Sequence, residues 1–311
     1  MIHYHGTPVG GSRQDVARFL IGRHALIPFG RQDDTGAVLE FCQSFCLDNG
    51  AFSHWKSGKG RIDFDAYLKW AESLRRHPGF DWALIPDIID GTEQDNLEWV
   101  NKWVMSGTRA KGVPVWHMHE SFEYLYYLCS NFEIVALGSS GNYKTPGAKA
   151  WWIRMGDAMK VICDEDGKPK CKLHGLRMLS TKVFTKLPLS SADSTNAAVN
   201  CGSLARFGMY KPATSSQRAA VIADRIESFN SAAFYEFKLR NDDENEISTD
   251  CRRRVLHEKS SSALPSTPKP EPLSDDEIMI LGKQNLCNEA NSFKPFGFAR
   301  AIAKAHGIGG E

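Results

Sequence analysis

The sequence predicts an α/β protein built on a (β/α)8 barrel, the TIM-like arrangement, followed by a C-terminal linker and a short helical appendage. Eight short apolar runs recur along the first 240 residues, and each ends in small or polar residues. The segments between the runs have apolar residues at helical spacing. Strands that alternate with helices are typical of this barrel. An open doubly wound sheet fits the same alternation, but the Gly-rich phosphate loop typical of that fold is absent from the sequence.

The expected strands follow one another in chain order and are short, as strands in such barrels are. They are HYHGTP from His3, ALIPFG from Ala25, SFCLDNG from Ser44, WALIPDI from Trp82, VPVWHMH from Val113, EIVALGSS from Glu133, KLHGLRML from Lys172 and LPLSSADS from Leu187. Helical spacing is clearest in FDAYLKWAESLRR after Ile62, NLEWVNKWV after Asp95 and SFEYLYYLC after Glu120.

The composition changes near the C-terminal end of the chain. The 311 residues are 42% hydrophobic and 24% charged, which suits one large globular domain. From about Asn241, serine, proline and charged residues dominate, and such a stretch cannot bury a core. We therefore expect a barrel over 1–240, a linker or loop over 241–275 and a helical appendage over 276–311.

Charge and cysteine content narrow the function classes. The 38 Lys and Arg residues balance 37 Asp and Glu residues, so only a local basic patch could attract a polyanion. No apolar run approaches the roughly 20 residues that cross a bilayer, and the opening MIHYHGTPVGG does not resemble a signal peptide. The 8 cysteines are scattered without a CxxC pair, so reduced thiols are expected. These features predict a cytoplasmic protein with no membrane partner.

Polar residues follow four of the expected strands directly. They are Asp48 in LDNGAF, Asp87 in IPDIID, Gly138 with Ser139 in ALGSSGNY, and Asp193 in SSADSTNAA. The carboxyl ends of barrel strands form one face, where active sites lie. Two carboxylates in one cleft suit a double displacement, in which one attacks as the nucleophile and the other carries the proton. Asp48 and Asp193 could fill these two roles. For the Gly138 turn, an ordinary strand-to-helix connection is the alternative.

Histidines suggest a competing chemistry. His3 with His5 and His117 with His119 are HxH pairs, whose members share one face of a strand. A metal-dependent hydrolase of the amidohydrolase kind uses such a pair with an aspartate on the last strand, a position that Asp193 could fill. A carboxylate-bridging lysine at a strand end is missing, so no metal is predicted. His174 fits a ligand contact, a proton carrier or a core residue.

Basic residues cluster around the last expected strands, where they form either a solvated face or a contact for a phosphate backbone. If they surround the barrel mouth, the residues that would contact nucleic acid are Lys172, Arg177, Lys182, Lys186 and Arg206. A nucleic-acid-binding module without catalysis therefore also stays open.

With these strand ends in order, residues 3–230 resemble the tRNA-guanine transglycosylase superfamily, and most closely its phage and bacterial DNA-modifying branch, the 7-deazaguanine DNA transglycosylases (DpdA). LDNGAF is similar to the DSGGF signature of the family, with Asn49 and Ala51 in place of Ser and Gly. PDIID, ALGSSGNY and SSADST match later family segments in the same order. The opening YHGTPVGG and the HGLRML segment resemble the DNA branch.

The resemblance implies the roles of individual residues. Asp193 would be the nucleophile and Asp48 the general acid and base. The substrate-binding residues would be Asp87, Asn49, Gly138, Ser139, His117, His119 and His174. The Cys/His zinc subdomain of the tRNA enzymes has no counterpart, which favours DNA over tRNA as the polymer, with a tRNA-guanine transglycosylase as the alternative. The expected partners are DNA, with its guanine nucleotide flipped out, and a free 7-deazaguanine base, without a cofactor. Homodimerisation is left open.

Overall fold

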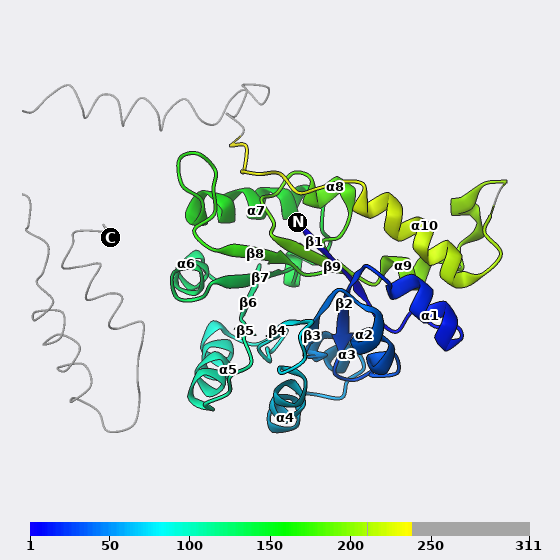
Figure 1. Cartoon of the computed structure of the whole chain (residues 1–311). Coiled ribbons are helices and arrows are strands. Elements are labelled where there is room, and N and C mark those ends of the chain that lie inside the picture. The colour runs from blue at the N-terminus through cyan, green and yellow to red at the C-terminus, as the bar shows by residue number, and fades with distance from the viewer. Residues whose placement is uncertain (210, 238–311) are drawn as a thin grey trace, which may run out of the picture. The chain divides into compact units, whose positions relative to one another are not determined.

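The structure, a computed structural model, describes residues 1–209 and 211–237 (Figure 1). The linker expected over 241–275 and the appendage expected over 276–311 lie outside the described residues.

The described part contains nine parallel strands in a single sheet. They are β1 (Ile2–Gly6), β2 (His24–Pro28), β3 (Ser44–Asp48), β4 (Phe80–Leu84), β5 (Gly112–Val113), β6 (Val115–His117), β7 (Ile134–Gly138), β8 (Lys172–Gly175) and β9 (Ser191–Ser194). Their spatial order is β5-β4-β3-β2-β1-β9-β8-β7-β6. The two ends of this order, β5 and β6, are separated in sequence by Pro114 alone.

Pro114 explains why nine strands form an eight-stranded barrel. Proline has no backbone N–H and interrupts a ladder of hydrogen bonds. The carbonyl of Val113 accepts from Ile85, next to β4, whereas the carbonyl of Pro114 accepts from Ala136 in β7. The two halves of this broken strand thus join both ends of the sheet. The barrel predicted from the sequence is confirmed, and each expected run contains or overlaps an observed strand, although β9 begins at Ser191 instead of Leu187.

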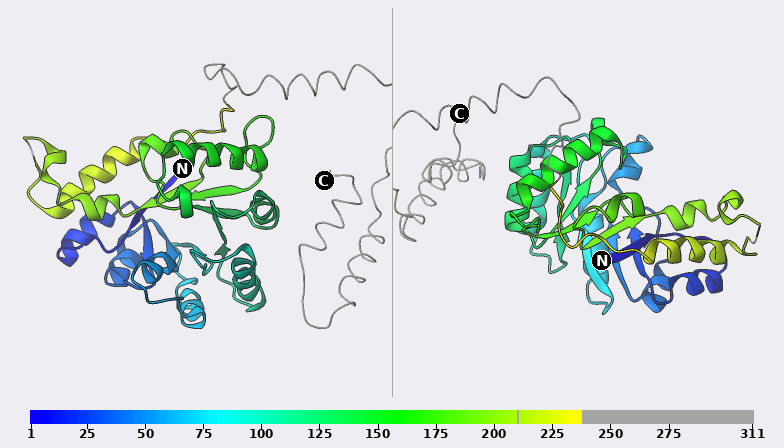
Figure 2. Two further views of the ribbon diagram at one scale, coloured as in Figure 1. Left: turned by 180° about the vertical axis from the view of Figure 1, so that it is seen from behind. Right: turned by 90° about the horizontal axis from the view of Figure 1, so that it is seen from above.

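Helices surround the barrel on its outer side (Figure 2). The longer ones are α1 (Arg13–Leu20), α2 (Thr35–Phe41), α4 (Phe64–Leu74), α5 (Glu93–Met105), α6 (Phe122–Asn131), α7 (Lys149–Ile162) and α10 (Ser215–Glu227). Shorter turns are α3 (Ala51–Lys56), α8 (Thr181–Phe184), α9 (Asn196–Asn200), η1 (Gly141–Tyr143) and η2 (Leu204–Phe207). The three helices predicted after Ile62, Asp95 and Glu120 are confirmed as α4, α5 and α6. No helix among the described residues is long and apolar enough to cross a membrane.

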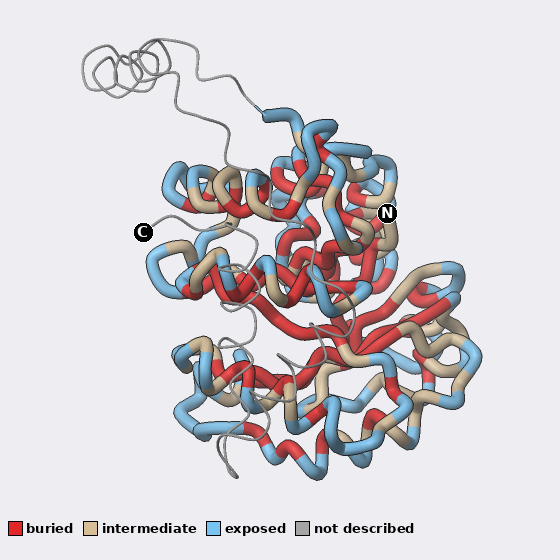
Figure 3. Tube along the Cα trace, turned by 90° about the vertical axis from the view of Figure 1, so that its left-hand side faces the viewer, coloured by how far each residue is buried: buried red, intermediate tan, exposed pale blue. Residues whose placement is uncertain are grey.

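The buried apolar residues form two separate layers. Figure 3 shows the buried stretches of the chain in red. The larger layer lies between the strands and the helices and includes Phe19, Leu47 and Trp151. The smaller layer fills the barrel interior and includes Tyr4 and Trp82. Because side chains alternate along a strand, this division shows which strand positions point inward.

A partly exposed hydrogen-bond network around Glu72 of α4 gives a first test of the fold's stability. Glu72 Oε1 accepts from the amides of Arg109 (2.8 Å) and Ala110 (3.3 Å) and from the hydroxyl of Thr108, and Glu72 Oε2 accepts from Arg75. Burial alone would raise the pKa of Glu72, but these donors lower it to about 2. The carboxylate therefore fixes the turn that leads into β5.

We expect Glu72→Ala to lower the free energy of unfolding by about 1–3 kcal/mol at pH 7, because it leaves amide donors unpaired. Glu72→Gln keeps the Oε1 acceptor and should lose less. The pKa is below its ordinary value, so the contribution of Glu72 is present above about pH 4.5 and declines toward pH 2. Urea unfolding between pH 7 and pH 3 measures this; a constant difference between wild type and Glu72→Ala would contradict it.

Candidate active site at the carboxyl end of the barrel

The alternation of side chains directs four of the predicted site residues into the barrel mouth. Cys46 and Val115 belong to the interior layer, so Asp48 and His117, two residues further along their strands, point inward as well. In the same way Ala136 places Gly138 on the inner side, whereas Ala192 packs in the outer layer and leaves Asp193 inward. All four lie at the carboxyl ends of their strands.

Asp193 is held by one of its two carboxylate oxygens. It is 4% exposed, and its Oδ1 accepts from the backbone amide of Arg177 at 2.9 Å. His174 Nε2 lies 3.3 Å from the same oxygen, and its ring is fixed through Nδ1 by Ser191 Oγ at 2.8 Å. Among the described residues, no hydrogen-bond partner contacts Oδ2. One oxygen is thus anchored while the other is available to react.

Asp48 lies in a contrasting environment. Its Oδ1 accepts a single hydrogen bond, from the amide of Gly50 at 3.2 Å. Burial, with the nearby charges of Asp193 and Asp87, raises the pKa of Asp48 to about 7, although the Gly50 amide opposes the shift. Gly50 has φ 79°, a conformation that favours glycine, so the residue type matters for this turn. Near neutral pH, Asp48 can both donate and accept a proton.

Asp87 is the centre of a third buried group. Asn49 Nδ2 donates to Asp87 Oδ1 at 2.6 Å and to the carbonyl of Ile85 at 2.9 Å. His117 Nε2 lies 2.9 Å from Asp87 Oδ2. Burial alone would lower the pKa of His117, but the contact with Asp87 outweighs it and raises the pKa. Asp87, Asn49 and His117 thus form a connected polar group near Asp48.

Sequence reasoning missed a fourth carboxylate, Glu120. It is 2% exposed and accepts from the amide of His117 and from Asn96 Nδ2, both at 2.7 Å. Burial raises the pKa of Glu120 to about 7, and the contact with His117 opposes the shift. Its position right after the VWHMH strand was a signal of the kind used for the other aspartates. Glu120 orients the backbone of His117.

The Gly138 turn packs closely against the histidines. A Cβ atom on Gly138 would lie 3.2 Å from Val115 and 3.3 Å from His117, so a larger residue would disturb both. After this turn, Ser139 Oγ accepts from Trp151, and Ser140 Oγ is 2.8 Å from His119 Nδ1. His119 therefore faces the turn and stacks on His117 with ring centroids 5.6 Å apart.

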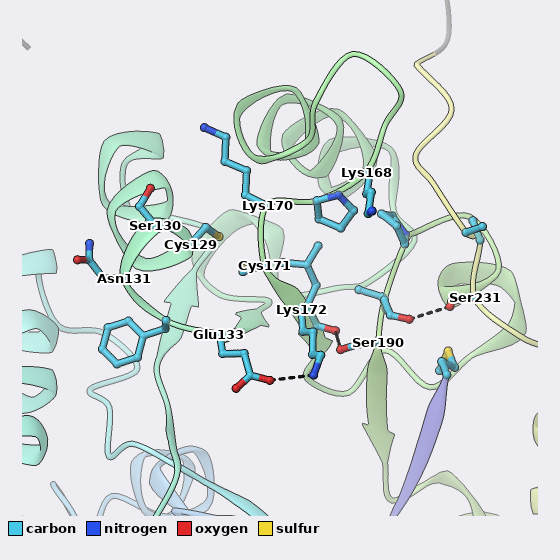
Figure 4. A pocket seen from close by; sticks show the side chains of 18 residues that line it. Cys129, Ser130, Asn131, Glu133, Lys168, Lys170, Cys171, Lys172, Ser190 and Ser231 are labelled. Carbon is cyan, nitrogen blue, oxygen red and sulfur yellow. Dashed lines mark hydrogen bonds and ion pairs between the residues drawn. The ribbon is translucent and has the colours of Figure 1, made fainter. Parts of the chain in front are cut away.

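The basic residues do not form one patch at the mouth. Arg177 lies there, with its amide on Asp193. Lys172 begins β8 at the opposite end of the barrel, where it pairs with Glu133 at 2.8 Å and lines a hollow of about 810 Å³ (Figure 4). Lys182 on α8 and Arg206 on η2 are exposed. Lys186 follows α8, with its Nζ 5.5 Å from the Trp152 ring. A phosphate contact at the mouth requires a basic residue that lies there. Arg177 does, whereas Lys172 does not.

The early HxH pair does not face the barrel interior. His5 Nε2 contacts Glu227 of α10 at 2.7 Å, and His3 Nε2 contacts the carbonyl of Phe229 at 3.0 Å. Both histidines therefore point outward, while Tyr4 between them points inward. In the described part of the chain, no group of three or more His, Cys, Asp or Glu side chains is arranged to hold a metal ion. An amidohydrolase-like site on His3 and His5 does not fit this geometry.

Fold and site together define a (β/α)8-barrel protein with a cluster of acidic side chains at the carboxyl ends of its strands. No protein-family model matches the chain, and no curated protein matches its sequence. Among solved structures, it is similar to a "putative fructose-1,6-biphosphate aldolase from Coccidioides immitis" with a TM-score of 0.44 and 12% identity, over 73% of this chain and 89% of that one. A chain of the tryptophan synthase α2β2 complex from Pyrococcus furiosus gives a TM-score of 0.42 and 12% identity, over 74% and 98%. These likenesses concern the fold.

Proposed function

We propose that this protein is a transglycosylase that exchanges guanine in DNA for a 7-deazaguanine base. The observation behind the proposal is the unequal pair of carboxylates at the barrel mouth. Asp193 is anchored through Oδ1 and has Oδ2 available, whereas the pKa of Asp48 is raised to about 7. A double displacement needs these two properties in two different groups. The ordered motifs shared with the transglycosylase superfamily add the class of substrate.

In the first step, Asp193 Oδ2 attacks C1′ of a guanine nucleotide. The bond from C1′ to the guanine nitrogen breaks, its electron pair leaves with the base, and protonated Asp48 supplies the proton. In the second step, Asp48 as a carboxylate takes the proton from the glycosidic nitrogen of the incoming base. That nitrogen bonds to C1′, and the ester electrons return to Asp193. Two inversions give net retention.

Asp87 and the Gly138 turn would contact the edge of the base. Each Asp87 oxygen has one protein contact and keeps a further acceptor position for a donor on the base. A larger residue at Gly138 would displace Val115 and His117, so the turn keeps its shape only with a glycine. Because C1′ and the base edge are hidden within a duplex, the target nucleotide has to be extruded or already single-stranded.

The test is an exchange assay with labelled guanine and with 7-cyano-7-deazaguanine, each offered with DNA and with tRNA in the presence of a chelator. We expect incorporation into DNA that the chelator does not reduce. Incorporation into tRNA alone would instead support a tRNA-guanine transglycosylase. Absence of incorporation into either polymer would contradict base exchange.

A further inference from the structure

The segment immediately after the Asp48 loop, residues 52–61, combines aromatic and basic side chains. Its sequence is FSHWKSGKGR, and no acidic residue lies between Asp48 and Asp63. Phe52 is 37% exposed and Trp55 is 46% exposed, so both rings are accessible to a ligand. Lys56 and Lys59 are exposed as well. A positively charged surface with interleaved aromatic rings is the usual way in which proteins bind single-stranded nucleic acid.

The two rings are held in defined positions. Phe52 and Trp55 lie three residues apart on α3 and therefore share one face, with ring centroids 5.9 Å apart. The indole Nε1 of Trp55 donates to Asp90 Oδ2 at 3.1 Å. The guanidinium carbon of Arg177 lies 4.3 Å from the centre of the Phe52 ring. Together, Phe52, Trp55 and Arg177 form an exposed surface that we name the aromatic platform.

The aromatic platform is connected to both carboxylates of the proposed reaction. Phe52 follows Asp48 by four residues, across the turn in which the Gly50 amide contacts Asp48. Arg177 contacts Phe52 with its side chain and Asp193 with its backbone amide. Arg177 has φ 56°, a backbone conformation that few residues other than glycine adopt. A ligand on the platform therefore lies beside the acidic cluster of Asp48 and Asp193.

We propose that the aromatic platform stacks an unpaired base next to the target nucleotide of a single DNA strand, while Lys56 and Lys59 contact its phosphates. This inference rests on the proposed function for the identity of the strand. The planar rings accept any base, because stacking needs only an aromatic face. The positive segment complements the phosphate charge, whereas the acidic cluster itself would repel it. The platform thus adds the affinity that the acidic cluster lacks.

The test compares wild type with Phe52→Leu/Trp55→Leu, a variant that keeps apolar bulk without aromatic faces. Binding of a fluorescein-labelled single-stranded oligodeoxynucleotide is measured by anisotropy without any free base. We expect Kd to rise about tenfold or more, as for the loss of one or two stacked bases. A matched control is Tyr126→Leu. Tyr126 lies on α6, away from the mouth; it is 46% exposed, and its ring contacts the side chain of Lys170. The control should bind like wild type.

The cations are tested through the salt dependence of the same binding. Lys56→Ala/Lys59→Ala should reduce the slope of log K against log salt by about 1.4, since each phosphate contact on a single strand contributes roughly 0.7. An unchanged Kd in the leucine variant would overturn the platform, whether or not the protein exchanges bases. Tighter binding of the matching RNA would overturn its assignment to DNA. Weakened binding in a protein without exchange activity would retain the platform and reject the proposed function.

Discussion

Asp193→Asn is expected to abolish base exchange, lowering its rate by roughly 10⁴-fold or more, as the loss of a nucleophile does in other covalent enzymes. An amide has no charged oxygen to attack C1′. The variant should fold normally, because the amide oxygen can still accept from Arg177 at the position of Oδ1. The measurement is exchange of labelled guanine, combined with denaturing electrophoresis of a covalent complex between protein and DNA.

The control for this prediction is Asp224→Asn. Asp224 lies on α10, outside the acidic cluster, and its exposed carboxylate pairs with Arg23. The Asp224→Asn variant should therefore retain exchange and the covalent complex. An Asp193→Asn protein that is folded and still exchanges bases would remove Asp193 from the role of nucleophile.

Asp48→Asn is expected to lower exchange by about 10²–10⁴-fold, the usual contribution of a positioned acid and base. In wild type, the pKa of Asp48 near 7 gives the two half-reactions opposite pH dependences. Release of guanine needs protonated Asp48 and should slow above about pH 7, whereas attack by the incoming base needs the carboxylate and should slow below it. Rapid-quench measurement of each half-reaction between pH 5 and pH 9 tests this. A profile that is flat in wild type would contradict the assignment.

The same substitution should affect stability in the opposite direction. The pKa of Asp48 is about 7 in the folded protein and near 3.8 ordinarily, so the unfolded chain loses this proton first. Wild-type stability therefore falls as pH rises from about 4 to 7, by about 2–3 kcal/mol for this half-buried group. Asp48→Asn has no such cost and should unfold at a higher temperature than wild type at pH 8. At pH 4 the two proteins should be equal.

The barrel could be predicted because an apolar run lies within or just before each strand, and small or polar residues follow it. Pro114 is the exception: the VPVWHMH run looks like one strand, and only the pairing on either side shows that it is two. The carboxyl ends of the strands also identified Asp48, Asp87 and Asp193, since a parallel barrel brings all such ends to one face.

Other features of the site depend on whether a strand residue points into the barrel or outward. A two-residue spacing shows that two side chains share a face, but not which face it is. His3 and His5 share a face, as predicted, but only the interior packing of Tyr4 shows that this face is the outer one. Lys172, Arg177, Lys182 and Lys186 are close together in the sequence. Because β8 passes from one end of the barrel to the other, Lys172 and Arg177 nevertheless lie at opposite ends. The surface over residues 52–61 was not predicted, because the sequence does not show that the Phe52 ring lies against Arg177 at the barrel mouth.

The contact between α10 and the outer side of β1 has a consequence for biosynthesis. His5 and Glu227 are 222 residues apart, and Glu227 also contacts Arg23 at 3.2 Å. At roughly 5–20 residues per second, a ribosome needs about ten to forty seconds to make the intervening chain. The first strand of the barrel therefore waits for one of its last helices, and translation has to pass α10 before the outer side of β1 is covered.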